Sequence, residues 1–372
     1  MTIIIKEVKT KKDLKTYIYL PEKIHQAHKN WLHPIYSDEF TFYSKKKNHT
    51  YSYSDTVLYL AYENDIPVGR IMGIINHKYN NANNQKQARF SFLETYDNQQ
   101  VADALLQKVE TWAKDHKMEQ LIGPFGFSDK EPQGLLIEGY DKPTVIVTNH
   151  SFKYLNNFVE ANGFSKKLDL VQYKVEIPKV IPQLYQDVAE RAYKNGYKII
   201  EFENRKKLKP YILPVFNLIN QTYTNIFGFA PFHDKEIFEF ANRYIYLLNP
   251  KLVKIALGKD DKLLAFVIAM PDLSEGIRKA KGRLFPFGIF HILKSGKKTN
   301  QLNLLLGAID EEYRNRGIDT MMAVSLLESA SKVGLEYIDS HLVMEENKPM
   351  RAEMERLGAE IYKRYRVYEK RI

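Results

Sequence analysis

The chain has 372 residues, of which 44% are hydrophobic and 13% aromatic, a composition typical of a globular protein and not of a disordered one. It contains no cysteine, which excludes disulfides, thiolate zinc sites and a cysteine nucleophile. The formal net charge of +10 suits anionic partners such as nucleic acid, acidic lipid or a polyanionic cofactor. The usual nucleic-acid signatures are missing, so nucleic acid is not an expected partner.

The N-terminal sequence MTIIIKEVKTKKDLK has only a short apolar run before its lysines and does not read as a signal peptide. No apolar stretch reaches the ~20 residues that are needed to span a bilayer. We therefore expect a cytoplasmic protein, and peripheral contact with the inner membrane face stays open.

In the first half of the chain, the hydrophobic pattern predicts helices that alternate with strands. The predicted helices are Lys12–His28, Val101–His116 and Lys153–Gly163. The predicted strands are Val57–Tyr62, Pro67–Ile75, Ala88–Leu93, Leu121–Phe127 and Lys167–Ile177. The segment Asn76–Gln87 is polar and is predicted to be a loop.

The second half repeats this order of elements after a link at Pro178–Gln183. The predicted helices are Gln183–Lys194, Leu208–Ile226 and Lys235–Leu248. The segment Tyr197–Phe202 starts this second unit, and the predicted strands are Leu252–Leu257, Leu263–Met270, Leu302–Ile309, Tyr337–Glu345 and Glu360–Tyr368. The order predicts two α/β domains with mixed sheets, residues 1–180 and 181–372, although no repeat is visible in the sequence itself.

The stretch Gln301–Leu327 is the part of the sequence that indicates a ligand. An apolar strand is followed by the charged turn Asp310–Arg316, by Gly317, and then by apolar residues at helical spacing. The N-terminus of a helix carries partial positive charge, and glycine lets an anion approach the main chain. Arg314 and Arg316 flank this point and could pair with phosphate oxygens. The alternative is an ordinary strand–turn–helix with a basic turn.

An inserted segment, Ser274–Lys298, has an apolar and aromatic centre at residues 284–293 between clusters of Arg and Lys. Such a pattern suits a segment that lies in a membrane interface, or one that lines a tunnel for an acyl chain. The alternative, which we favour from sequence, is a helix packed on the protein's own core.

The turn resembles the pyrophosphate loop of the GCN5-related N-acetyltransferase (GNAT) superfamily, whose pattern is [Q/R]-x-x-G-x-[G/A]. Here it reads Arg314, Asn315, Arg316, Gly317, Ile318, Asp319, and Asp319 departs from the pattern at its last position. The resemblance implies that these residues bind coenzyme A, and that the main chain of Leu304–Ile309, with Ala308 and Ile309 at its end, pairs with the pantetheine amides.

The segment NKPMRAEMERLG resembles the superfamily's N-x-x-(M/A)…L-G region, which implies that Asn347 lies near the pantetheine. The superfamily often has a tyrosine as general acid where this chain has Met354. Tyr362, Tyr365 and Tyr368 follow in the last strand and could substitute for it.

In the first half, KYLNNFVEANGF resembles the superfamily's Y-x-x-x-G-F region, but ETYDNQQ stands at the pyrophosphate-loop position without Gly or Arg. The whole chain is similar to bacterial acyl-CoA N-acyltransferases made of two tandem GNAT-like domains. The resemblance implies a degenerate loop in the first domain and an acyl-CoA site in the second.

Such a reaction needs an oriented amine, a general base and a backbone N–H for the oxyanion. The candidate bases are His341 and Glu345, which in a regular strand share a face with Asp339. The alternatives are a histidine satisfied within the sheet and a glutamate that caps the helix near Asn347. The ten histidines show no H-x-x-x-H spacing, so we expect no metal.

The expected function is therefore the transfer of an acyl group from acyl-CoA to an amine, with a small-molecule or lipid acceptor such as a sphingoid base. Two alternatives stay open. One is a catalytically degenerate GNAT pair that serves as a binding or scaffold protein, and the other is a transferase of the FemABX kind that takes aminoacyl-tRNA.

Overall fold

The computed structural model describes residues 2–372, apart from the side chain of residue 243, and shows a mixed α/β architecture. The strands are β1 Ile3–Glu7, β2 Ser54–Glu63, β3 Ile66–Asn76, β4 Gln87–Thr95, β5 Gln120–Gly123, β6 Leu135–Glu138, β7 Ser165–Glu176, β8 Lys198–Ile200, β9 Val253–Leu257, β10 Leu263–Pro271, β11 Gln301–Ile309, β12 Tyr337–Met344 and β13 Glu360–Arg371. The helices are α1 Lys11–Ile24, α2 Tyr36–Phe42, α3 His77–Asn83, α4 Gln99–Asp115, α5 Tyr154–Ala161, α6 Gln183–Lys194, α7 Ile212–Thr222, α8 Asp234–Tyr244, α9 Ser274–Ala280, α10 Gly288–Gly296, α11 Ile318–Lys332 and α12 Lys348–Arg356.

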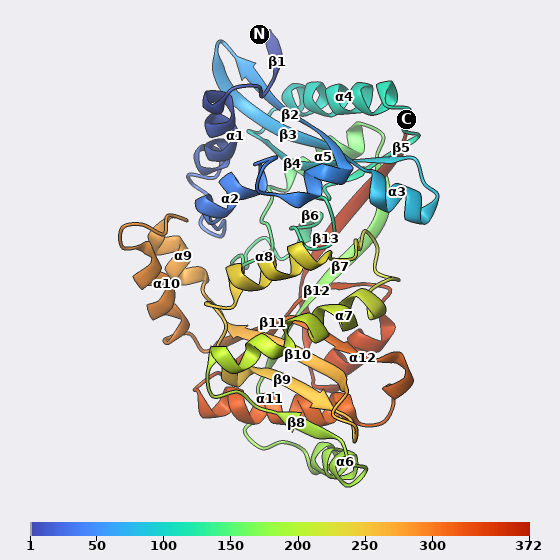
Figure 1. Cartoon of the computed structure of the whole chain (residues 1–372). Helices are drawn as coiled ribbons and strands as arrows, with labels where there is room; N and C mark the ends of the chain where they lie inside the picture. Colours follow the sequence, from blue (N-terminus) through green and yellow to red (C-terminus); the bar gives the residue numbers. More distant parts are fainter. Residues whose placement is uncertain (1) are drawn as a thin grey trace.

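Within the described residues, the strands form one continuous sheet that runs through both halves of the molecule (Figure 1). The order is β1-β2-β3-β4-β5-β13-β7-β12-β11-β10-β9-β8, and β6 pairs with β13 outside this path. The two ends of the sheet are therefore built alike, each from five strands in chain order.

The centre of the sheet is made by two exchanged strands. β13, the last strand of the chain, pairs antiparallel with β5 of the first half, and β7 pairs antiparallel with β12 of the second half. β7 and β13 also pair with each other, and a two-pronged ion pair joins them at Asp169 and Arg366. The final strand of each half thus completes the sheet of the other. The division into domains at residue 180 stays a prediction.

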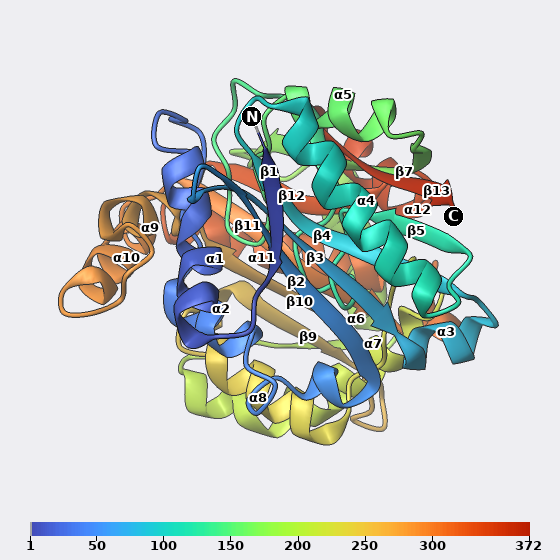
Figure 2. The ribbon, with the colours of Figure 1, turned by 90° about the horizontal axis from the view of Figure 1, so that it is seen from above.

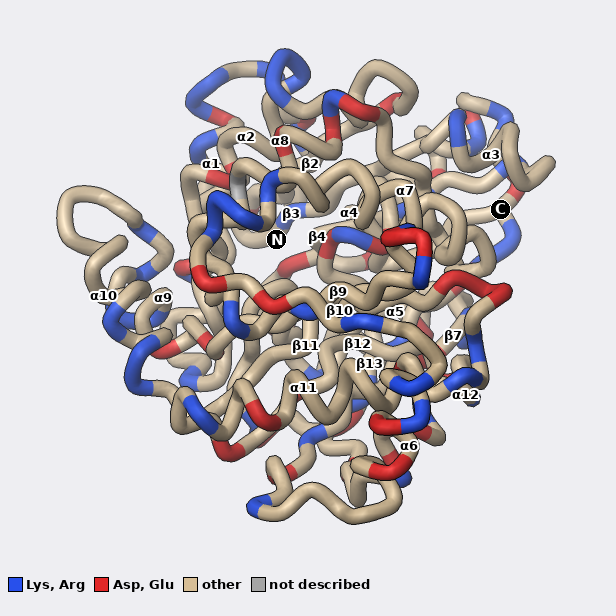
Figure 3. Tube along the Cα trace, turned by 60° about the horizontal axis from the view of Figure 1, so that its bottom comes forward, with Lys and Arg blue, Asp and Glu red and all other residues tan. Residues whose placement is uncertain are grey.

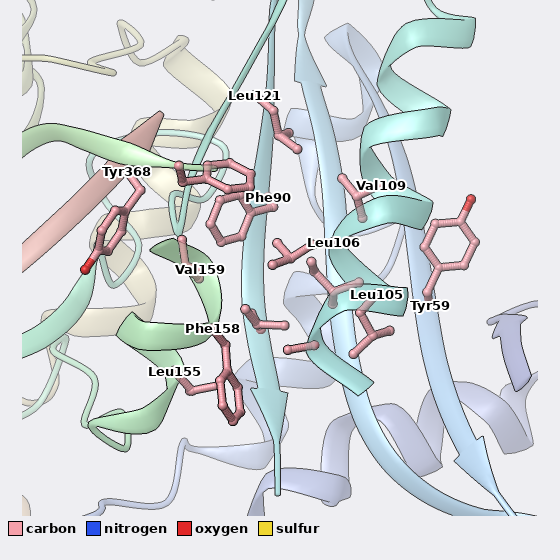
Figure 4. Close-up of a cluster of buried hydrophobic side chains, with 14 of the residues drawn as sticks. Tyr59, Phe90, Leu105, Leu106, Val109, Leu121, Leu155, Phe158, Val159 and Tyr368 are labelled. Atoms are coloured by element: carbon pink, nitrogen blue, oxygen red, sulfur yellow. The ribbon is translucent and has the colours of Figure 1, made fainter. Parts of the chain in front are cut away.

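The helices cover both faces of the sheet (Figure 2). Neighbouring side chains of a strand point to opposite faces, and here both sets are buried, so each face needs a covering layer. In the first half, α4 packs on the face that carries Tyr59 and Ile71, and α1 packs on the opposite face with Leu60 and Met72. Figure 4 shows Leu105, Leu106 and Val109 of α4 close to Phe90, with α5 completing this core. Tyr368 of β13 belongs to the same core, so the C-terminal strand stabilises the first half directly.

The polar segment Asn76–Gln87, which the sequence predicts as a loop, contains the helix α3, so that prediction is wrong. The side chain of Asn76 caps this helix by accepting a hydrogen bond from the backbone N–H of Tyr79 at 2.9 Å. Asn84 ends the helix in the left-handed conformation, with φ of 51°. Asparagine is common at both ends of a helix, because its side chain caps the first turn and its backbone tolerates the left-handed conformation. A prediction from apolar periodicity does not detect these end signals.

The inserted segment folds into the helices α9 and α10, which pack on each other and project from the side of the molecule (Figures 1 and 2). We call this pair, residues 274–298, the helical arm. Its inner face, with Ile277 and Ile292, is fully buried. Its outer face leaves Phe285 and Phe287 83% and 69% exposed, so only part of the segment packs on the protein as the favoured sequence interpretation expects.

Candidate functional site

The turn between β11 and α11 has the backbone conformation that the sequence suggests. Asn315 and Gly317 lie in the left-handed region, with φ of 60° and 79°, and α11 begins directly afterwards at Ile318. The backbone N–H groups of the first helical turn have no partner within a helix. These groups therefore point out of the N-terminus of α11 and are available to an anion.

The side chains of this turn show both features that favour an anion and features that oppose one. Arg314 and Arg316 are exposed, Arg314 pairs with Glu311 at 3.2 Å, and the guanidinium of Arg316 lies over the ring of Tyr313 at 5.0 Å. Asp319 lies in the first turn of α11, where its charge competes with that of a bound anion. A Cβ on Gly317 would meet Val188 of α6 at 2.9 Å, so helix packing alone already requires glycine there.

The strands beside this turn separate as a pantetheine slot requires. β11 and β12 are paired in parallel only from Gln301 to Asn303, and beyond that point the edge of β11 is no longer paired with β12. Ala308 and Ile309 lie at the end of this edge and pair with β10 on the other side. The hydroxyl of Tyr223 occupies part of the open edge through hydrogen bonds with Gly307.

The expectation that His341, Asp339 and Glu345 share one face of a regular strand is wrong. His341 has φ of 59°, and the pairing of β12 with β7 shifts between Asp339 and Leu342. This bulge removes the alternation on which the expectation rests. Burial lowers the pKa of His341, which keeps its ring neutral near pH 7.

Asp339 is fully buried at the point where β11 and β12 separate, and it gathers several of the residues singled out from sequence. Its carboxylate accepts hydrogen bonds from the hydroxyl of Tyr362 and from Nε2 of Gln172, the latter at 2.6 Å. Tyr365, also fully buried, reaches Gln172 at 3.5 Å. Burial and then the charge of Asp339 raise the pKa of Tyr362, so this hydroxyl keeps its proton.

Glu345 and Asn347 have structural contacts in addition to their expected roles. Glu345 pairs with Lys166 at 3.1 Å and with Arg364 at 2.7 Å. The hydrogen bond from Lys166 lowers the pKa of Glu345, which suits an ion pair better than a base that must take up a proton. Asn347 caps α12 by accepting a hydrogen bond from the N–H of Met350. The roles proposed from sequence for these residues stay predictions.

A second opening, which sequence reasoning missed, lies where β4 and β5 separate in the first half. These strands pair in parallel only from Gln87 to Arg89, and a cleft of approximately 360 Å³ lies beyond that point. Residues 91–94 of β4 line it, together with side chains of α8 and α9 from the second half. We call it the first-half cleft. Its lining comes from segments as far apart as Pro21 and Ile277, so no local sequence pattern could reveal it.

Among the described residues, no group of three or more His, Cys, Asp or Glu side chains is arranged to hold a metal ion.

Two known proteins are similar to the chain over almost its whole length. No family model matches the chain. It is 26% identical to Protein YghO of Escherichia coli (strain K12), over 97% of this chain and 94% of that protein. It is also 26% identical to a protein named bacterial ceramide synthase from Caulobacter vibrioides (strain NA1000 / CB15N), over 98% and 96% of the two chains.

Two solved structures match this chain over almost its full length and over almost their own full length. A tandem GNAT protein from the clavulanic acid biosynthesis pathway has a TM-score of 0.58 at 11% identity and covers 100% of this chain and 98% of its own. A GNAT protein from Sphaerobacter thermophilus has a TM-score of 0.52 at 11% identity, over 99% and 95%. The tandem GNAT-like fold expected from the sequence is therefore confirmed.

Proposed function

We propose that this protein transfers an acyl group from acyl-CoA to the primary amine of a long-chain amino-lipid, such as a sphingoid base, and forms an amide. The observation that carries the proposal is the open edge of β11 beside the N-terminus of α11, the arrangement that a pantetheine arm and a pyrophosphate need together. The full-length similarity to a protein named bacterial ceramide synthase supports an amino-lipid as the acceptor.

The residues at this site fit coenzyme A in charge and in backbone geometry. Arg314 and Arg316 are exposed cations next to the free N–H groups of Ile318, Asp319 and Thr320, which suits a pyrophosphate. The edge of β11 from Leu304 to Ile309 would bind the pantetheine amides, and Asn347 follows β12 on the other side of the opening.

The chemistry requires a direct attack and no covalent enzyme intermediate. The amine nitrogen adds to the thioester carbonyl carbon, the C–N bond forms, and the C–S bond breaks. Of the two protons that leave the ammonium nitrogen, one goes to a base and the other to the departing thiolate. Burial raises the pKa values of Tyr362 and Tyr365, so both stay protonated at the centre of the sheet and serve as hydrogen-bond donors, while their role as general acid stays a prediction.

The helical arm supports a substrate that is taken from a membrane. The side chains of Phe285, Phe287, Phe290 and Leu293 are between 44% and 83% exposed on its outer side. Lys and Arg positions precede and follow these residues along the arm, which Figure 3 shows as a backbone tube with Lys and Arg in blue. Aromatic side chains of this kind enter the interface of a bilayer while the cations meet anionic headgroups. No helix among the described residues is long and apolar enough to cross a membrane.

The test is a calorimetric titration with acetyl-, octanoyl- and palmitoyl-CoA. We expect binding that tightens with chain length, and an affinity that falls by at least about 10-fold in Arg316→Glu because a cation next to the phosphates becomes an anion. Arg356→Glu, an exposed position on α12, is the matched control and should bind like the wild type. Absence of binding to all three thioesters would overturn the proposal.

A scaffold protein that shares the fold is the second candidate, because the Tyr223 hydroxyl occupies the edge at Gly307 and Asp319 opposes an anion. It predicts no turnover with any thioester. A transferase of the FemABX kind predicts activity that Arg316→Glu leaves intact.

A further inference from the structure

The first-half cleft combines apolar side chains with an excess of carboxylates. Six acidic residues line it (Asp38, Glu39, Glu94, Glu131, Glu236 and Glu239), against three lysines and arginines (Lys47, Arg70 and Lys130). The protein as a whole has a net charge of +10, so the acidic lining is a local reversal of charge. A concentration of carboxylates favours a cationic ligand.

Some buried polar atoms of the cleft lining have no hydrogen-bond partner among the described residues. Arg70 is 4% exposed and its Nε makes no hydrogen bond, and His150 is 2% exposed with its Nδ1 unpaired. Buried polar atoms normally find a hydrogen-bond partner, and exceptions mark places where a ligand or water completes the structure. The cleft therefore has the character of a binding site and not of a packing fault.

A chain of histidines leads away from the cleft. Oε2 of Glu94 lies 2.8 Å from Nε2 of His25, and Nδ1 of His25 lies 2.9 Å from Nδ1 of His28. The rings are fixed by stacking, since His25 lies between Trp31 and Phe152 with interplanar angles of 2° to each. Glu94 lines the cleft, whereas His25 is buried behind it, so the fixed ring of His25 holds the Glu94 carboxylate at the wall of the cleft.

Few charged groups face this row of histidines. Glu94 and His25 act on His28, and burial followed by the charge of His25 lowers the pKa of His28 to about 4. His150, which meets His28 edge to face at 4.5 Å, has its pKa lowered to about 4 by burial and then by the charge of His28. Lys363 adds a further positive charge near His150. His28 and His150 are therefore neutral near pH 7 and add no positive charge behind Glu94.

The apolar part of the cleft extends toward the helical arm. Its apolar lining includes Phe232 and Phe240, and also Ile146 and Ile277. Ile277 lies on the inner face of α9, and Ile146 packs against the same small core as α9 and α10. Apolar side chains therefore line the cleft as far as the base of the arm, where an aliphatic chain can lie.

We propose that the first-half cleft is the acceptor site, which binds a primary ammonium group attached to an aliphatic chain, with Glu94 as the carboxylate that meets the ammonium. The ammonium gives one proton to the Glu94–His25 pair and becomes the neutral amine that attacks the thioester. The transfer step of this assignment rests on the acyltransferase function proposed above. The binding of the amine to the cleft does not depend on that function and can be tested separately.

The experiment measures binding of n-dodecylamine by calorimetry, below its micelle concentration, with n-dodecanol as a ligand of equal chain length and no charge. We expect Glu94→Gln to weaken amine binding by at least about 10-fold, because a charge-assisted contact becomes a neutral one, and to leave dodecanol binding unchanged. Glu63→Gln, in the hairpin turn outside the cleft, is the matched control. Equal amine affinity in the two variants would overturn the assignment.

A second variant protects the test against misfolding. If thermal unfolding shows that Glu94→Gln is not folded, Glu94→Met, which removes the carboxylate at nearly the same side-chain volume, replaces it with the same expectation. Palmitoyl-CoA binding, measured in parallel, separates the two proposals. Amine binding that depends on Glu94, without any acyl-CoA binding, would overturn the proposed function and keep the amine-binding site. Acyl-CoA binding without amine binding would overturn the amine-binding site and keep the acyl-CoA site.

Discussion

The hydroxyl of Tyr223 forms hydrogen bonds with both main-chain groups of Gly307, donating to the carbonyl oxygen at 3.0 Å and accepting from the N–H at 3.3 Å. Gly307 lies on the edge of β11 that β12 leaves unpaired, so the tyrosine takes the place that a pantetheine amide would take. Under the proposed function, acyl-CoA displaces this hydroxyl when it pairs with the strand.

Removing the hydroxyl should therefore tighten donor binding. Tyr223→Phe leaves the ring in place and frees both groups of Gly307, and a hydrogen bond of about 1 kcal/mol corresponds to an affinity gain of about 5-fold. The measurement is the Kd for palmitoyl-CoA. Tyr246→Phe, at a position that is 69% exposed, should leave it unchanged. A weaker complex in Tyr223→Phe would show that the hydroxyl helps to bind the donor.

The ion pair between Asp169 and Arg366 should stabilise the centre of the sheet. The two distances are 2.8 and 2.9 Å, and only 5% of the Asp169 side chain is exposed. Arg366→Ala leaves this carboxylate with Lys166 alone, which should lower the free energy of unfolding by about 2 kcal/mol. Denaturant unfolding measures it. Arg356→Ala, which breaks an exposed pair, should change stability by less than about 0.5 kcal/mol.

The same pair predicts how stability depends on pH. Burial alone would raise the pKa of Asp169, but hydrogen bonds from Arg366 and Lys166 outweigh it and hold the pKa below its ordinary value of 3.8. A lowered pKa in the folded state contributes stability above pH 4 that is lost as the pH falls through the folded pKa. The gap in stability between wild type and Arg366→Ala should therefore narrow below pH 4. A difference in the free energy of unfolding between the two proteins that stays constant down to pH 2.5 would contradict the ion pair.

Glu39 predicts the opposite dependence. Burial raises its pKa from 4.5 to about 7, although the charge of Arg70 opposes the shift. A carboxyl group whose pKa is raised by folding favours the folded state below its unfolded pKa, and this contribution is lost as the pH rises through about 7. Glu39→Gln should therefore gain stability relative to wild type between pH 5 and pH 8, measured by thermal unfolding. Glu63→Gln should show no such trend.

The helical arm should bind anionic vesicles through its aromatic side chains. Replacing Phe285, Phe287 and Phe290 by serine removes three exposed rings and should weaken binding to vesicles with anionic lipid by at least about 100-fold. A sedimentation assay measures it. Phe238→Ser, at an exposed position on α8, is the control. Unchanged binding in the triple variant would place any membrane contact elsewhere.

The strand–turn–helix at Gln301–Leu327 could be predicted from sequence because each part is local. The apolar run forms β11, Gly317 has the left-handed conformation that glycine favours, and the helical spacing forms α11. The fold class followed from the order of such elements. The short strand β1 and the helix α3 were missed because their sequences are brief or polar.

The exchanged strands and the cleft could not be predicted, since both depend on pairing between distant segments. Nothing in the sequence of β13 indicates that it lies between β5 and β7. His341 was assigned to a face by strand alternation, which the bulge after Asp339 breaks. Glu94 and His25 are 69 residues apart, and only the folded chain shows that they form a pair.

The measurement that tests the central claim most directly is turnover with palmitoyl-CoA and a long-chain sphingoid base. Because the chain contains no cysteine, a thiol reagent reports released coenzyme A without a signal from the protein. We predict thiol release that requires the amine and matches, mole for mole, the N-acyl product measured by mass spectrometry. Thiol release that is independent of the amine, or no release at all, would contradict acyl transfer to an amino-lipid.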